Sequence, residues 1–431
     1  MSGRTVTALT ILVAALCAPA TASSAPFEAG LDRLSKVAVQ HRGRVKPLAV
    51  AAAEITAEAD RRSQSTPAPG DGGPVAALFS LSAGEDQSDQ AVFMNLHLFP
   101  TKGEWLSADE AAAEGVPGSD KAAFAALTEE TLASWKARDG RAFAVAAEKL
   151  ASLLEVLQGR YGVDDGRLSA EIALVRLRPF LLSAFAYLIA AAVLAVLAGR
   201  EARGLSAVAA GIAFGFNVSG LALYSWVAGR LPVNNGYEGM LVLAAVLGLF
   251  ALAGCAFWRL SPVAVMASLF AGLALLAGEL TPLRSPITPP VPALQSLWLQ
   301  VHVLTCFVAY AAFAVAFGAA IVVLVSRREK VRAGFDAIAV RSTLFGFIFL
   351  SVGILTGAAW ARQAWGRYWG FDPKETWALV TWLIYAAYLH LVFLKGRRRT
   401  LRAAAAVIGF LAVLFTFIGV NHLLAGLHSY L

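Results

Sequence analysis

The feature that most constrains this chain is a series of long apolar runs that begins after residue 178. We identify about eight of them, at residues 179–198, 207–227, 240–257, 263–280, 299–325, 342–361, 377–394 and 401–424. Each is long enough to cross the ~30 Å hydrocarbon core of a bilayer as an α-helix. Backbone polar groups must pair internally in lipid, and runs of this length satisfy that requirement as helices. The sequence therefore predicts an all-α polytopic membrane protein with about eight transmembrane helices.

Composition supports this fold class and removes a competing interpretation of the charge. The 431 residues are 58% hydrophobic and only 15% charged, which is outside the range of ordinary soluble proteins. The formal net charge is +7. In a membrane protein, basic residues report first on topology, so this excess does not point to nucleic acid. We expect no nucleic-acid partner.

The basic residues cluster in alternate loops between the apolar runs. They lie at Arg200, Arg203, Arg259, 327–332 and 395–399. The opposite loops carry only scattered charges such as Arg230, Arg284 and Arg367. Because loops rich in lysine and arginine remain on the cytoplasmic side, the clustered side is expected to be cytoplasmic. The pattern predicts a multi-pass membrane protein with the other loops on the outer side of the membrane.

The N-terminal part of the chain has a different character. Residues 1–22 combine Arg4, a short apolar core and the small-residue site Ala20-Thr21-Ala22, which is typical of a secretory signal peptide. Residues 23–175 have soluble composition with helical periodicity, and we expect an exported, mainly helical extramembrane domain. Residues 176–431 form the transmembrane domain. The exported domain carries His41 and His97, which we interpret as ordinary histidines without convergent partners.

The topology places four features on the outer side of the membrane. These are residues 231–240 (LPVNNGYEGM), His302, the stretch 365–377 (WGRYWGFDPKETW) and the C-terminal segment with His428. Imidazole is a strong axial ligand for haem iron. Two histidines from different spans that flank an aromatic surface therefore indicate a haem site, with His302 and His428 as candidate iron ligands.

The aromatic stretch is the candidate surface for the porphyrin. Tryptophan and tyrosine faces pack against flat apolar rings while their polar edges stay hydrated. The candidate residues are Trp365, Arg367, Tyr368, Trp369, Phe371, Asp372 and Trp377, with Arg362 and Lys374 close enough to meet carboxylates. An interfacial aromatic belt is the ordinary alternative, but a belt spreads such residues over every span end. Asp372 and Glu375 also fit a second role, because Asp-Pro-x-Glu is a capping box at a helix start.

The segment WGRYWGFDPKETWALVTWLIYAAYLH resembles the tryptophan-rich WWD signature of haem-handling proteins in cytochrome c maturation. The best match is the CcsA (ResC) branch of the system II cytochrome c biogenesis proteins. VHVLTCFVAYAAF, PVNNGYEGM and GLHSY in the transmembrane domain also resemble that branch, and QHRGRVKPL in the exported domain resembles its longer versions. One departure is Phe371, where the family usually has tryptophan. His422 also looks atypical and is interpreted as a bystander.

The resemblance implies specific roles for three histidines. It makes His302 and His428 the outer axial ligands of haem b laid against residues 365–377. It makes His390 a membrane-embedded histidine that holds haem on its way outward. At 1.5 Å per residue, His390 lies about 20 Å along the helix from Trp377, which places it near the cytoplasmic face. An ordinary interfacial histidine beside residues 395–399 is the alternative for His390.

The function implied is cytochrome c maturation, with haem b carried to the outer face for covalent attachment to the CxxCH cysteines of apocytochromes c. The chain would be a subunit of a holocytochrome c synthase (haem lyase) that acts by positioning haem, with no other catalytic residue. The alternative is a non-catalytic haem transporter or delivery protein that feeds a separate ligase. A third class, the electron-transfer or quinone cytochromes, normally pairs histidines inside the bundle, whereas here only His390 is deep.

The resemblance also implies partners. A CcsB (ResB)-like membrane subunit is expected to supply a histidine that pairs with His390, because the other five histidines of the chain are all expected on the outer side. Apocytochromes c are the expected substrates together with haem. Cys17, Cys255 and Cys306 show no CxxC spacing, so other proteins are expected to keep the apocytochrome thiols reduced.

Overall fold

The computed structural model describes residues 26–42, 44–62, 73–82, 96–100, 105–107, 118–160, 163–196, 200–256, 261–280, 287–290, 292–394, 398–424 and 426–427. The chain divides into two units, Met1–Leu168 and Ser169–Leu431. That division and the predicted boundary between residues 175 and 176 both fall in helix α9 (Asp165–Leu177). The predicted signal peptide, residues 1–22, lies outside the described residues.

The described residues of the first unit are mainly helical, as predicted. The helices are α2 (Pro26–Ser35), α3 (Leu48–Arg62), α4 (Gly73–Ser82), α7 (Gly118–Lys136) and α8 (Gly140–Gly159). Two antiparallel hairpins pair β1 (Ala38–His41) with β2 (Arg44–Pro47) and β3 (Phe99–Pro100) with β4 (Trp105–Leu106). The core of this unit includes the fully buried side chains of Leu34, Phe79, Phe143 and Leu150.

The motif QHRGRVKPL of the first unit forms the β1–β2 hairpin, which sequence patterns did not reveal. Lys46 on β2 is fully buried, and its Nζ lies 2.9 Å from both carboxylate oxygens of Glu54 on α3. A buried lysine is tolerated only when its charge is paired in this way. His41 Nε2 lies 3.6 Å from the same carboxylate, and burial lowers the pKa of His41 below its ordinary value. The motif therefore ties the hairpin to α3.

The second unit confirms the predicted membrane architecture. In the described part of the chain, eight helices are long and apolar enough to cross a bilayer. They are α10 (Pro179–Val196), α11 (Arg200–Ala228), α12 (Gly236–Ala256), α13 (Ser261–Leu280), α14 (Leu297–Val325), α15 (Glu329–Trp365), α16 (Pro373–Phe393) and α17 (Arg399–Leu414), the last continued by η3 (Phe415–Gly419) and α18 (Val420–Leu423). The eight match the eight apolar runs one for one.

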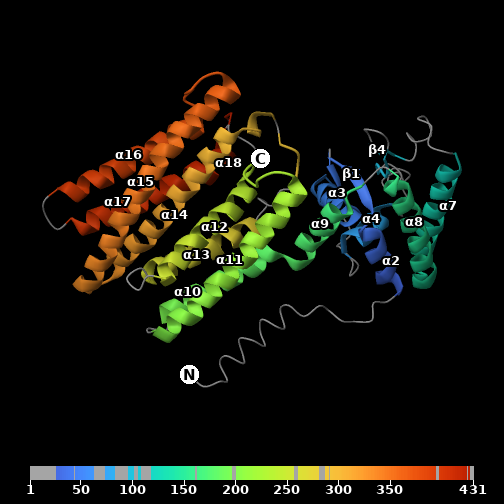
Figure 1. The fold of residues 1–431 in the computed structure, drawn as a ribbon, viewed down its shortest axis with the longest axis horizontal. Coiled ribbons are helices and arrows are strands. Elements are labelled where there is room, and N and C mark those ends of the chain that lie inside the picture. The colour runs from blue at the N-terminus through green and yellow to red at the C-terminus, as the bar shows by residue number, and fades with distance from the viewer. Residues whose placement is uncertain are drawn as a thin grey trace. The chain divides into compact units, whose positions relative to one another are not determined.

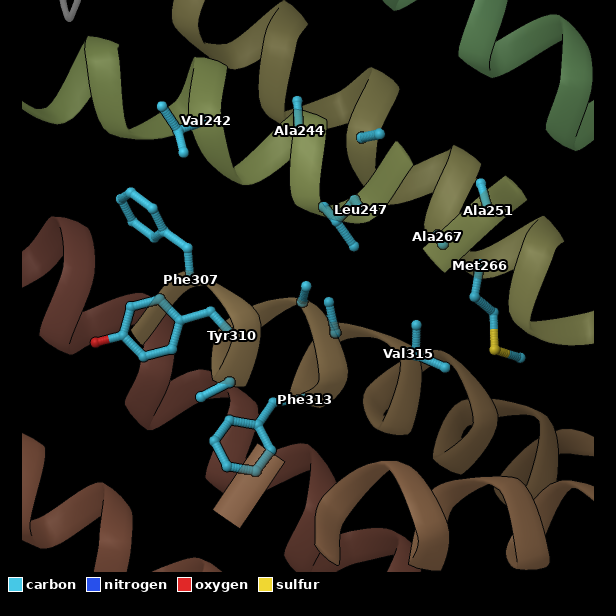
Figure 2. Close-up of a cluster of buried hydrophobic side chains, with 14 of the residues drawn as sticks. Val242, Ala244, Leu247, Ala251, Met266, Ala267, Phe307, Tyr310, Phe313 and Val315 are labelled. Atoms are coloured by element: carbon cyan, nitrogen blue, oxygen red, sulfur yellow. The ribbon is translucent and has the colours of Figure 1, made fainter. Parts of the chain in front are cut away.

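Helix α14 is the centre of the bundle. It packs against α12 and α13 on one side and against α15 and α17 on the other, and 61% of an apolar 18-residue stretch of α14 is buried. Figure 2 shows Phe307 of α14 directed toward Val242 of α12, with Leu247 and Met266 in the same apolar layer. Helix α16 is the opposite case, because only 17% of its apolar 18-residue stretch is buried. It lies near α15 and α17 at one side of the bundle (Figure 1).

Helix α15 is longer than its apolar run because polar residues extend it. The sequence predicted a span at 342–361, whereas the helix covers 37 residues from Glu329 to Trp365. Asp336 lies in the added part, is 9% exposed, and forms ion pairs with Arg402 and Arg399 of α17. Hydropathy alone could not detect this extension, because charged residues lower the hydropathy of the segment. In the structure, ion pairs with another helix allow these charged side chains to be buried.

Candidate functional site

A cavity opens at the end of the bundle where α14 begins, α15 ends and α16 begins. Its empty volume is about 1130 Å³, a figure that includes space open to solvent. The lining includes His302, Cys306 and Tyr310 of α14, Gly357 and Trp360 of α15, Tyr368 and Trp369 of the following loop, Lys374 and Glu375 of α16, Asn234 and Asn235 before α12, and Thr416, Phe417 and Asn421. His302 and Tyr310 are eight residues apart, so the cavity runs about 12 Å along α14.

His302 is held in a defined orientation on the cavity wall. Its Nδ1 lies 2.7 Å from the carbonyl oxygen of Gly353 on α15. Because a carbonyl only accepts hydrogen bonds, Nδ1 carries a proton in this contact, and in the neutral imidazole Nε2 then carries the lone pair. Metal-binding histidines commonly donate their second ring nitrogen to a backbone carbonyl in this way. The imidazole of His302 is therefore in the tautomer that an axial iron ligand requires.

Two glycines of α15 make room for this arrangement. A Cβ at Gly357 would lie 2.7 Å from Cε1 and Nδ1 of His302, and a Cβ at Gly353 would lie 2.7 Å from Sγ of Cys306. Such distances are too short for real contacts, so a larger residue at Gly357 would displace the imidazole. The ring also lies nearly parallel to that of Trp360, with a ring-centroid distance of 6.2 Å and an interplanar angle of 14°. Residues of α15 therefore fix the orientation of His302.

The aromatic stretch contributes two aromatic side chains to the cavity and others to its support. Tyr368 and Trp369 line the cavity together with His302. Trp365 contacts the edge of Trp360, with ring centroids 4.8 Å apart, and so supports the ring that lies against His302. Helix α15 ends at Gly366, whose φ of 78° is the left-handed conformation that glycine adopts readily. The helix therefore ends just before Tyr368 and Trp369, which line the cavity.

The remaining predicted aromatic and basic residues lie beside the cavity without lining it. Phe371 is 76% exposed and has a φ of 54°, and its ring lies 6.1 Å from that of Trp369. Trp377 packs against Phe415 at 4.3 Å. Arg367 is exposed and lies over Gly370, where a Cβ would be 2.5 Å from its guanidinium carbon. Their roles toward haem stay predictions.

The capping box at the start of α16 is confirmed. Asp372 accepts a hydrogen bond from Lys374 N at 3.2 Å, and Glu375 accepts one from Asp372 N at 3.1 Å. Glu375 also accepts from Gly370 N at 2.7 Å, which fixes the loop that carries Trp369. The two acids therefore set the angle between the aromatic loop and α16, as the sequence predicted.

The far wall of the cavity depends on a local change of helix type. Residues Phe415–Gly419 form a π-helical turn, a feature that often occurs at functional sites. Thr416, Phe417 and Asn421 of this region line the cavity. Lys374 Nζ donates to Asn421 Oδ1 at 2.9 Å, so a half-buried ammonium group is held at the cavity wall. The sequence patterns did not predict this π-helical turn.

A buried ionic network supports the Asn234–Asn235 wall, and sequence reasoning missed it. Glu238 of α12 is fully buried and accepts from both terminal nitrogens of Arg230 at 2.7 Å. It also accepts from Tyr224 Oη at 2.9 Å and Asn234 N at 2.8 Å. Burial lowers the pKa of Arg230, but the hydrogen bond and charge of Glu238 outweigh this and raise it. An acidic residue at the start of an apolar span was the signal available.

The structure does not place the other two predicted iron ligands, His390 and His428, in the cavity lining. His390 lies on the exposed side of α16, and its Nδ1 is 3.3 Å from the Ala386 carbonyl of the same helix. It is 16 residues from Lys374, or about 24 Å along the helix, and does not line the cavity. His428 lies outside the described residues, which end at Leu427. His422 is exposed, with Nδ1 2.9 Å from the Ile418 carbonyl.

This arrangement is suited to binding and orienting a flat ligand. One oriented imidazole, one ammonium group and the rings of Tyr368 and Trp369 face the same space, which is also lined by other aromatic and apolar side chains such as Phe307 and Ile354. No group of three or more histidine, cysteine, aspartate or glutamate side chains suitable for a bare metal ion occurs among the described residues.

The sequence of this chain is similar to a known protein family and to individual members of it. The profile of the family described as cytochrome C assembly protein matches residues 213–428, half of the chain. The chain is 38% identical over 225 residues to the cytochrome c biogenesis protein CcsA of Chlamydomonas reinhardtii, covering 49% of this chain and 64% of that protein, which is less than two thirds of its length. It is 36% identical over 249 residues to CcsA of Parasynechococcus marenigrum (strain WH8102), covering 49% and 81%.

A solved structure is also similar to this chain, at lower similarity. It is that of the cytochrome c heme lyase CcmF, which is 18% identical, with a TM-score of 0.46 over 57% of this chain and 46% of that one. The family match begins after residue 212, so it covers most of the second unit and the whole of the cavity lining.

Proposed function

This chain belongs to the family of cytochrome c assembly proteins, and we propose that it carries haem b to the outer face of the membrane and holds it between His302 and His428. There the haem is presented for covalent attachment to the CxxCH cysteines of apocytochromes c. The family membership agrees with the resemblance seen in the WWD-like segment, and cytochrome c biogenesis is the role of the CcsA proteins to which the chain is similar.

The observation that carries the proposal is the oriented imidazole of His302 on the wall of a cavity that also contains Tyr368 and Trp369. The lone pair on Nε2 supplies an axial ligand, and the aromatic faces supply a surface for a porphyrin. The ammonium group of Lys374 pairs with a propionate carboxylate. The donor set of this chain therefore fits haem.

The protein contributes orientation to the reaction. Bound haem supplies the vinyl groups to which cysteine thiols add. The chain's own residues hold the ring plane against Trp369, keep His302 in the required tautomer, and leave the cavity mouth accessible to a peptide. Holding two reactants in a productive geometry lowers the barrier without a general base or a nucleophile. The holocytochrome c synthase activity is therefore one of positioning.

The entry of haem requires a second subunit. His390 on α16 lies on the exposed side of the least buried span, on the same helical face as Leu379 and Leu383, which are 37% and 52% exposed. A CcsB (ResB)-like membrane protein covers this face and supplies a histidine that pairs with His390. The complex resides in the bacterial cytoplasmic membrane with the cavity on the outer side, and separate proteins keep the apocytochrome cysteines reduced.

The spectrum of the purified protein tests the ligand assignment. If His302 and His428 both bind iron, the complex shows a six-coordinate low-spin haem spectrum. His302→Gly and His428→Gly each lose this spectrum and cytochrome c assembly, and added imidazole restores part of both by filling the vacated position. Wild-type spectra and assembly in both variants would contradict the proposal.

The alternative is a non-catalytic haem delivery protein that feeds a separate ligase. The two are separated by co-expressing the chain and its partner with an apocytochrome c in cells that lack other maturation systems. Covalent haem on the apocytochrome supports the synthase. Normal haem loading of the complex without covalent product supports delivery.

A further inference from the structure

The backbone that leads to the C-terminus is attached to the first turn of α16. Leu427 N donates to Oδ1 of Asp372 at 2.6 Å, although the two residues are 55 positions apart. The other oxygen of the same carboxylate, Oδ2, accepts from Lys374 N at 3.2 Å, the bond that caps α16. Asp372 is only 7% exposed. One buried carboxylate therefore serves two backbone donors from two different segments.

The contact at Leu427 is part of a close approach. A Cβ at Gly426 would lie 2.6 Å from Oδ1 of Asp372 and 3.1 Å from Cδ of Pro373, so the chain passes there at a distance that glycine allows. Six residues earlier, Asn421 accepts from Lys374 Nζ at 2.9 Å. The segment 421–427 is thus attached to α16 at both ends.

A helix cap alone does not account for an aspartate at this position. Asparagine and serine cap helices about as well as aspartate, and burial of a charged carboxylate carries a cost that a neutral cap avoids. A carboxylate differs from an amide in having two acceptor oxygens. An asparagine at residue 372 could accept from Lys374 N, but its NH₂ group would then face the N–H of Leu427. Both interactions are satisfied only by the acid.

We propose that Asp372 is a positioning residue for the outer haem site: its carboxylate anchors the backbone at Leu427 and so fixes the point from which the next residue, His428, begins. The inference rests on the proposed function, in which His428 is an axial ligand. Mutation of groups that orient a metal-binding side chain without binding the metal commonly lowers metal affinity by about 10–100-fold. An anchor one residue before the ligand acts in the same way.

The test compares four variants of the full chain, each co-purified with its membrane partner. Asp372→Asn keeps the cap acceptor and removes the acceptor for Leu427. Gly426→Ala forces the same segment away from Asp372. His428→Gly removes the ligand itself. Thr376→Val is the matched control, because it removes only the local 3.3 Å bond from Thr376 Oγ1 to the Phe371 carbonyl in the same turn of α16.

Two measurements are made on each variant. Hydrogen exchange of the C-terminal peptide in haem-free protein reports the anchor directly, and the haem spectrum with and without imidazole reports the ligand. Asp372→Asn and Gly426→Ala are expected to speed exchange at Leu427 by about tenfold or more, as loss of a hydrogen bond to a charged group predicts. Both are expected to shift haem away from the low-spin form, with imidazole restoring it. Thr376→Val changes neither.

The outcomes separate this inference from the proposed function. If His428→Gly keeps the wild-type spectrum, the ligand assignment and hence the proposed function fail, whatever Asp372→Asn does. If His428→Gly loses the low-spin form while Asp372→Asn keeps both the spectrum and slow exchange, only the anchoring role of Asp372 is overturned. Loss of folding in Asp372→Asn, measured as a lower melting temperature that imidazole does not affect, without a matching change in Gly426→Ala, also overturns it.

Discussion

The two ends of helix α16 differ in how much of their surroundings this chain provides. At its N-terminal end, which we propose faces outward and call the outer end, Asp372, Lys374 and Glu375 bond to residues of the aromatic loop and of the C-terminal segment, beside a cavity that contains His302. At its C-terminal end, which we call the inner end, His390 is exposed, and its Nδ1 lies 3.3 Å from the Ala386 carbonyl of its own helix. The outer end is built within the chain, whereas the inner end presents a histidine on an open face.

The difference indicates where a partner is needed. A histidine whose ring is fixed by Gly353 and Trp360 from a neighbouring helix is oriented before any ligand arrives. A histidine on an open helix face gains a fixed geometry only when another surface covers it. The inner end of α16 is therefore the place where we expect a second subunit to act, and four predictions test this contrast.

The largest effect is expected at the inner end. His390→Ala, co-expressed with the partner, is expected to lose most of the haem acquired in cells, because entry fails before the outer site is filled. Haem added to the purified variant is still expected to give the six-coordinate outer spectrum, since His302 is untouched. Absorption spectra of the two preparations provide the measurement. Normal haem content in cells would show that the inner end does not depend on His390.

The second prediction concerns the ion pairs of Asp336 with Arg399 and Arg402, which join α15 to α17 without lining the cavity. Asp336→Asn leaves Arg399 and Arg402 of α17 without this carboxylate. Removing one partner of a buried ion pair costs about 3–5 kcal/mol, so the melting temperature in detergent falls clearly. The haem spectrum of the folded fraction is expected to be unchanged.

Two further variants test whether the loss of stability in Asp336→Asn comes from the unpaired buried charge. The double variant Asp336→Asn with Arg402→Met is expected to recover part of the stability, since the uncompensated charge is reduced. Lys149→Met removes an exposed pair with Glu130 in the first unit and is expected to cost at most about 1 kcal/mol. An altered haem spectrum in Asp336→Asn would mean that the two ends of the bundle are coupled.

The third prediction concerns the packing that orients His302. Gly357→Ala places a methyl group against the imidazole, and overpacking of this kind costs about 1–3 kcal/mol. We expect weaker haem binding and a weakened low-spin spectrum, measured by titration with haem. Gly334→Ala in the same helix is the control, because no atom lies within 4 Å of its Cβ position, and it is expected to bind haem normally. Equal binding in both variants would argue that His302 is free to reorient.

The smallest effect distinguishes two aromatic residues of one loop. Trp369→Ala removes a ring that lines the cavity. It is expected to weaken haem binding by about 0.5–1.5 kcal/mol in addition to the loss from reduced buried apolar area. Phe371→Ala removes a ring that is 76% exposed and does not line it, so we expect a smaller loss. A haem titration of each variant compares them. A larger effect at Phe371 would mean that the ring moves over the ligand on binding.

The amino-acid sequence alone determined the architecture and the region of the site. Eight apolar runs predicted the eight spans because a lipid-exposed helix must be apolar over a length set by the bilayer. The motif Asp-Pro-x-Glu predicted the start of α16 because capping is local in the chain. The histidine and the aromatic stretch were identified by residue type, and His302, Tyr368 and Trp369 meet in the cavity.

Only the tertiary structure decided which neighbours act on these residues. The carbonyl of Gly353 that sets the tautomer of His302, and the carboxylate of Asp372 that binds Leu427, belong to partners 51 and 55 residues away. The full burial of Glu238 likewise follows from helices that pack around it. Periodicity and capping depend on residues within a few positions, whereas these contacts depend on how helices pack. For that reason the sequence predicts the helices and the candidate ligands, and the packing determines how they are held.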